Sequence, residues 1–189
     1  MRTSIFISLL FTLLLVSCPA NSSTQTTTNF LAQITDFGEF DRFPMEVSGY
    51  HRGQVTAYAP DMSDFSIAYN SGSPLFQNGV TLYFYPRFGD AATQLANEKA
   101  EILQAHPNAR VVSEQMLKIQ QPSGAFDATV TTFEYMGNFA GHIQNVSSQL
   151  ILVLLPTTSF KVRSTTPVEQ GVLAESALRK LLDKVKWAP

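Results

Sequence analysis

The sequence predicts an α+β fold in which an antiparallel β-sheet of about six strands is flanked by helices. Several segments rich in Val, Ile, Thr, Tyr and Phe are separated by short runs of turn-forming residues, as is typical of strands. Two of these segments flank the turn Gln121 to Gly124, which indicates an antiparallel hairpin. Helical patterns interrupt the strands once and close the chain, an order typical of a layered α+β domain.

The N-terminus has the pattern of a secretory signal peptide over residues 1–17. Arg2 supplies the positive charge, and the apolar run from Ile5 to Val16 is broken only by Ser8 and Thr12. A membrane-spanning helix needs about 20 apolar residues, so this run is too short to span.

The leader ends at Cys18, the only cysteine of the 189 residues, so no disulfide can form within the chain. The segment Leu15-Val16-Ser17-Cys18 resembles the bacterial lipobox. The resemblance implies that the lipoprotein signal peptidase recognises Leu15, Val16 and Ser17. It also implies that Cys18 becomes the N-terminus and carries diacylglycerol and usually an N-acyl chain such as palmitate. The alternative is an ordinary cleaved signal followed by a coincidental cysteine.

A lipid anchor at Cys18 would hold the protein at a membrane of the cell envelope. Two or three acyl chains anchor stably, because each buried methylene contributes about 0.8 kcal/mol. Pro19 stands where enterobacterial lipoproteins of the inner membrane usually carry Asp, which favours the outer membrane facing the periplasm if the host is Gram-negative. The small polar residues that follow predict that 18–29 is a disordered tether and that 30–189 is a single α+β domain.

The first half of that domain is expected to be mostly strands. A short helix or turn around Phe30 to Phe37 precedes them. Strands are expected over Val47 to Tyr58, Phe65 to Tyr69 and Val80 to Tyr85, with a turn at Asp61 to Asp64 and a loop at Asn70 to Pro74.

A helix is predicted from Ala91 to about Ala105, because Asp90 is a good N-cap and Pro107 ends the pattern. Its sheet-facing side is expected to be a narrow stripe of small and apolar residues: Ala92, Leu95, Ala96, Lys99, Ile102 and Leu103.

The second half is expected to hold a hairpin, a loop and two further strands. The expected segments are strands at Arg110 to Ile119 and Ala125 to Tyr135, a loop at Met136 to His142, a central strand at Gln149 to Leu155 covered on both faces, and a strand at Phe160 to Ser164.

A closing helix is predicted from about Val168 to Lys186, with acids early and bases late, as the helix dipole favours. Trp187 is expected to fix its end against the sheet. The residues expected on its buried face are Ala174, Ala177, Leu178, Leu181 and Val185.

The meander, the helix after a Tyr/Phe-rich strand, the apolar strand leading into Phe160 to Pro167 and the amphipathic closing helix resemble the PsbP-like fold, including the bacterial DcrB-like lipoproteins. The likeness covers about residues 43–188. Because members of this fold mostly act through protein contacts, the resemblance implies a binding or accessory role.

The sequence lacks the common signatures of catalysis. The metalloprotease, serine hydrolase, phosphate-loop and dinucleotide motifs are absent. His51, His106 and His142 lie in separate segments, and no cysteine lies inside the domain, so we expect no metal and no cofactor. The formal net charge of −2 argues against a nucleic-acid partner.

Three groups of residues remain as alternative sites. The acids Asp36, Glu39 and Asp41, and Asp61 with Asp64, could bind calcium or act as acid and base, but they lack the calcium-loop pattern and more often cap turns. Tyr50, Tyr58, Tyr69, Tyr83, Tyr85 and Tyr135 could line a pocket or be half-buried strand residues. Asn138, Phe139 and His142 could form a contact loop or a plain hairpin connection.

Three functional hypotheses follow. The first is a membrane-tethered, non-catalytic accessory lipoprotein that docks on an envelope protein or complex. The second is a carrier of a small apolar ligand in a pocket between the sheet and the helix at Ala91 to Ala105. The third is an enzyme whose site is built from loop-borne Asp, His and Tyr groups.

Overall fold

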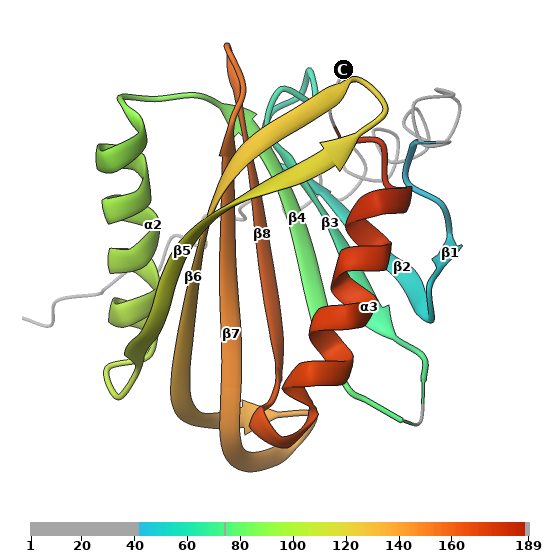
Figure 1. The fold of residues 1–189 in the computed structure, drawn as a ribbon, viewed down its shortest axis with the longest axis vertical. Helices are drawn as coiled ribbons and strands as arrows, with labels where there is room; N and C mark the ends of the chain where they lie inside the picture. Colours follow the sequence, from blue (N-terminus) through green and yellow to red (C-terminus); the bar gives the residue numbers. More distant parts are fainter. Residues whose placement is uncertain (1–41, 74, 188–189) are drawn as a thin grey trace, which may run out of the picture.

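The computed structural model describes residues 42–73 and 75–187 of the chain, which form an eight-stranded antiparallel sheet with two α-helices (Figure 1). The strands are β1 (Glu46–Val47), β2 (Tyr50–Ala57), β3 (Phe65–Ser71), β4 (Gly79–Pro86), β5 (Arg110–Gln121), β6 (Gly124–Phe139), β7 (His142–Leu154) and β8 (Thr158–Pro167). The helices are α2 (Ala91–Ala105) and α3 (Gly171–Lys184), the latter preceded by the 3-10 turn η2 (Val168–Gln170).

The predicted α+β class and antiparallel sheet are confirmed, but the sheet has more strands than the expected six. One reason lies in the segment expected as a single strand from Val47 to Tyr58. Ser48 and Gly49 have positive φ angles of 52° and 85°, which reverse the chain and divide the segment into β1 and β2.

The sheet consists of two four-stranded meanders joined at its centre. Its strand order is β1-β2-β3-β4-β8-β7-β6-β5, and β4 pairs with β8 from Gly79 to Pro86. Helix α2 carries the chain from the central strand β4 to the far edge at β5. Both edges of the sheet are therefore formed by the first strand of a meander.

The two helices cover opposite faces of the sheet. On β7, Leu150 belongs to the cluster that contains Ile102 of α2, whereas Ile151 belongs to the larger core that contains Leu178 and Leu181 of α3. Neighbouring residues of a strand point to opposite faces. The expectation that Gln149 to Leu155 is covered on both faces is therefore confirmed for the stretch Leu150 to Val153, which is buried throughout.

The closing helix matches its predicted buried face. Ala174, Ala177, Leu178, Leu181 and Val185 are all buried. Trp187 is also buried, with its ring stacked on that of Phe160 at 4.5 Å between centroids. The indole therefore fixes the end of α3 against the sheet, as predicted.

Helix α2 has the predicted bounds but a different buried face. Asp90 caps it, its Oδ1 accepting from the Thr93 N–H at 2.7 Å. Ile102 of the expected stripe is buried and Leu95 packs against its cluster, but the other buried residues are Gln94 and Glu98, and Ala92, Ala96 and Leu103 are exposed. Gln94 and Glu98 can be buried because the strands beneath α2 present polar partners to this helix.

The prediction of a loop from Met136 to His142 is also wrong. β6 continues to Phe139, which pairs with His142, so only Ala140 and Gly141 form the turn. Their φ angles are 52° and 85°, as a two-residue hairpin turn requires. Gly137 lies inside the strand, where an added Cβ would come within 2.9 Å of the Tyr135 ring.

The turns predicted at Asp61 to Asp64 and at Gln121 to Gly124 are confirmed, but the loop expected from Asn70 begins only after Ser71, because β3 continues to that residue and pairs there with β2. The β5–β6 hairpin turns at Pro122 and Ser123. At the Asp61 turn, the carboxylate accepts hydrogen bonds from the backbone N–H and hydroxyl of Ser63, at 3.0 and 2.7 Å.

Several predictions fall outside the described residues. These are the leader and lipobox, Cys18, the tether, the helix expected after Phe30, and the acids Asp36, Glu39 and Asp41. Within the described ranges, neither helix combines the length and apolar character needed to cross a bilayer.

Candidate ligand groove between β5 and α3

The face of the sheet that meets α3 changes from polar to apolar along the strands. Strand register places four polar residues side by side in one row across β5, β6, β7 and β8: Ser113, Thr132, Gln149 and Ser164. The next row is Gln115, Val130, Ile151 and Val162, and the row after it is Leu117, Ala128, Val153 and Phe160. One end of this surface therefore offers hydrogen-bonding groups, and the other offers hydrocarbon.

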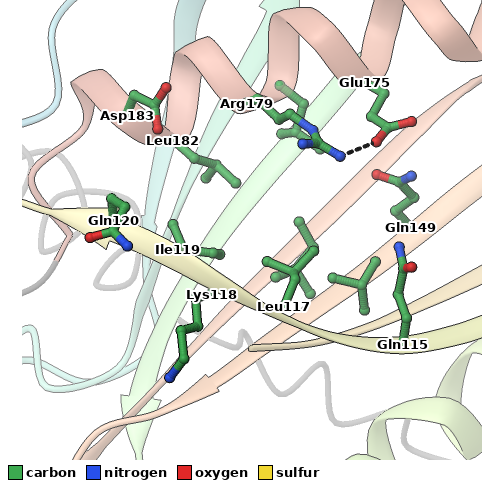
Figure 2. A pocket seen from close by; sticks show the side chains of 13 residues that line it. Gln115, Leu117, Lys118, Ile119, Gln120, Gln149, Glu175, Arg179, Leu182 and Asp183 are labelled. Carbon is green, nitrogen blue, oxygen red and sulfur yellow. Dashed lines mark hydrogen bonds and ion pairs between the residues drawn. The ribbon is translucent and has the colours of Figure 1, made fainter. Parts of the chain in front are cut away.

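Helix α3 leaves part of this surface uncovered, as a groove between the helix and β5 (Figure 2). The hollow has a volume of about 390 Å³. Its apolar lining comes from Leu117, Ile119, Val130, Ile151, Leu178 and Leu182. In Figure 2, Leu117 and Ile119 lie between β5 and α3, whereas the side chain of Lys118 points away. The alternation of β5 thus directs every second side chain into the groove.

A second hollow continues the first toward the polar row. It has a volume of about 330 Å³ and shares Gln115, Gln149 and Glu175 with its neighbour. Ser113, Thr132, Ser147 and Ser164 also line it. The two hollows together form one surface with an apolar and a polar half, which we call the β5–α3 groove.

The charged side chains at the rim largely compensate one another. Arg179 donates to Glu175 at 2.6 Å, and Lys118 pairs with Asp127 at 2.8 Å. Such exposed pairs contribute little to stability. Asp183 also lines the groove, and no ion pair joins it to another residue of the described ranges. The groove is therefore close to neutral, with one uncompensated acid near the end of α3.

The opposite face carries a buried polar network beneath α2. Lys161 Nζ lies 2.6 Å from Glu98 Oε2, and Tyr85 donates its hydroxyl proton to the other Glu98 oxygen at 2.5 Å. Gln94 donates to the Tyr85 oxygen at 3.0 Å and accepts from Ser159 at 3.0 Å. Burial raises the pKa of Tyr85, and the bond to Glu98 adds to that rise. These groups satisfy one another, so the network holds α2 to the sheet.

The structure does not gather the predicted histidines. His51 lies on β2, 3.3 Å from the Glu46 carboxylate, and His142 begins β7. His106 follows α2 and stacks on Tyr135 at 3.9 Å, where burial lowers its pKa. In residues 42–73 and 75–187, no group of three His, Cys, Asp or Glu side chains is arranged to hold a metal ion.

The other sequence-predicted site residues also lie apart from the groove. Asn138 accepts from the Gly141 N–H at 3.1 Å, so it stabilises the hairpin turn in which Phe139 and His142 are paired. None of the six tyrosines lines either hollow. Burial raises the pKa of Tyr50 and of Tyr69 to about 12 each, as expected for core positions.

Sequence reasoning missed the groove residues. The alternation of Gln115, Leu117 and Ile119 in β5 is visible in the sequence, as is Gln149 at the start of an apolar run. Their meeting depends on strand order and register, which no local pattern supplies. No model of a known family and no curated protein sequence matches this chain.

Proposed function

We propose that this protein is a lipid-anchored, non-catalytic binding or accessory protein of the cell envelope, which docks on an envelope protein or complex. The leader and the lipobox at Leu15 to Cys18 support the anchor. The resemblance to PsbP-like and DcrB-like domains supports a role through protein contacts.

The observation that carries the binding role is the β5–α3 groove. It combines hydrocarbon from both the sheet and the helix with a row of hydroxyl and amide groups on neighbouring strands. Concave surfaces that are largely apolar, with a few convergent polar groups, are typical of binding sites. The rim residues Glu175 and Arg179 pair with each other, so their charges compensate at the groove rim.

The test is photocrosslinking in cells that produce the chain with its leader. A photoreactive residue replaces Arg179 at the groove rim, or Asn138 at the far hairpin, both of which are exposed. We expect a discrete crosslinked envelope protein from position 179 and none from position 138. Crosslinks from neither position would contradict docking, and crosslinks from 138 alone would move the docking site away from the groove.

The groove volume favours a second candidate function, a carrier of a small apolar or amphipathic ligand. About 390 Å³ lies within the range of small-molecule sites, roughly 300 to 1,000 Å³. This hollow lies against α3, on the sheet face opposite to that expected for a pocket beside Ala91 to Ala105. Native mass spectrometry of the full chain from gentle detergent tests it: a retained ligand supports a carrier, and an empty chain contradicts it.

A further inference from the structure

The edge strand β5 presents a long row of unpaired backbone groups. It has 12 residues, and β6 pairs with it along its length. Across the described part of the chain, no strand pairs with its other side. In an antiparallel ladder about half of the residues direct their N–H and C=O groups outward, so about six residues of β5 present such groups. The opposite edge, β1, has only two residues.

The usual protections of a long edge strand are weak here. Proteins shield exposed edges with proline, bulges, charges or covering segments. β5 contains no proline, and its register shifts only near its start, between Val111 and Ser113. Its charges are occupied within the molecule, because Glu114 pairs with Lys99 at 2.7 Å and Lys118 pairs with Asp127. The edge is therefore competent to accept another strand.

This unpaired strand also forms one wall of the groove. Leu117 and Ile119 direct their side chains into the groove, and Gln115, Lys118 and Gln120 border it (Figure 2). The six residues of β5 from Gln115 to Gln120 span about 20 Å, and the roughly four turns of α3 cover about the same length. A strand added to the free edge of β5 would direct every second side chain to the same side as Leu117 and Ile119, toward α3 (Figure 2).

The chemistry of the groove specifies what such a strand must carry. The lining around Leu117, Ile119 and Leu182 requires apolar side chains. The row of Ser113, Thr132 and Gln149 suits small side chains with hydroxyl or amide groups. Near the end of α3, the Asp183 carboxylate favours a positive charge.

We propose that the β5–α3 groove binds an extended peptide segment of the partner protein, which adds to β5 as a ninth strand and places alternate apolar side chains in the groove and a basic residue beside Asp183. Strand addition obtains affinity from backbone hydrogen bonds and specificity from side-chain pockets. The inference rests on the proposed docking function and specifies its recognition mode.

The test uses random dodecapeptides displayed on phage, selected on the lipidated full chain in detergent. Two exposed neighbours on β5 provide matched variants: Gln115→Trp places a ring in the groove, and Met116→Trp places one on the opposite face. We expect selected peptides to alternate apolar residues. A ring at position 115 fills the site, so the peptides should bind Gln115→Trp at least about tenfold more weakly than the unchanged chain. Their affinity for Met116→Trp should differ from that for the unchanged chain by less than about twofold.

A synthetic copy of a selected peptide with N-methyl groups on alternate residues tests the backbone pairing directly. One of its two methylation registers should abolish binding, because it removes the donors that face β5. Three results would each overturn strand addition. The two methylated copies could bind equally, the selected peptides could bind the Gln115→Trp variant as well as the unchanged chain, or sedimentation could show that the chain associates with itself through β5. In the first two of these cases, the envelope protein would still crosslink to a photoreactive residue at position 179. Failure of strand addition is therefore distinguishable from failure of the docking function.

Discussion

Replacing Glu98 by Gln tests how α2 is held to the sheet. The Glu98 side chain is 6% exposed and that of Lys161 is 13% exposed, with 2.6 Å between their charged atoms. The substitution keeps an acceptor for the Tyr85 hydroxyl but leaves the ammonium without its main counterion. Removing one member of a buried ion pair costs about 3 to 5 kcal/mol. We expect about 3 kcal/mol, at the low end, because the Glu101 carboxylate lies only 3.9 Å from Lys161 Nζ.

The assay is urea unfolding of the full chain in detergent, followed by circular dichroism. The double variant Glu98→Gln with Lys161→Met should recover about 2 kcal/mol of the loss, since no charge remains buried. Lys99→Met breaks a more exposed pair with Glu114 and should change the unfolding free energy by less than about 1 kcal/mol. A loss below about 1 kcal/mol for Glu98→Gln, or a double variant as unstable as the single one, would refute the reasoning.

Three further predictions concern the core, a histidine and the anchor. Trp187→Ala should lower the unfolding free energy by about 3 to 5 kcal/mol, because it removes the ring stacked on Phe160; a loss under about 1 kcal/mol in the same assay would contradict this packing. Because the pKa of His106 is lowered in the folded chain, the unfolded chain is protonated at this residue at a higher pH, so the unfolding free energy should fall as the pH drops below about 6.5. His106→Phe should remove this pH-dependent loss of stability. An unchanged dependence of the unfolding free energy on pH in the variant would contradict the prediction. Cys18→Ser should abolish palmitate labelling and membrane partitioning of the mature chain, and retained labelling would contradict the lipobox interpretation.

Local signals in the sequence were sufficient to predict both helices and the β5–β6 hairpin. Asp90 and Pro107 mark the bounds of α2, and the apolar stripe around Leu178 and Leu181 identifies the buried face of α3. These features depend on residues close in the chain, where periodicity and capping carry the information.

The buried face of α2 could not be predicted in this way. Gln94 and Glu98 are polar, and a stripe of Ala and Leu is a better apolar face by pattern alone. Their burial depends on Ser159 and Lys161 of β8, more than 60 residues later in the chain. Only the tertiary pairing of β4 with β8 brings these partners beneath the helix.

The candidate groove was hidden for a similar reason. Ser113, Thr132 and Gln149 become a row only when β5, β6 and β7 pair in the observed register. The contact loop expected at Asn138 was misread because Gly137 and Asn138 are turn formers by composition. In the structure, Gly137 is a strand residue that makes room for the Tyr135 ring.

Hydrogen–deuterium exchange on the lipidated chain tests the docking account most directly, by comparing native membranes with purified protein in detergent. We expect slower exchange in native membranes along β5 and across the groove-facing part of α3, because the partner covers these segments, and unchanged exchange in α2. Equal exchange in both preparations, or protection confined to the α2 face, would contradict the account.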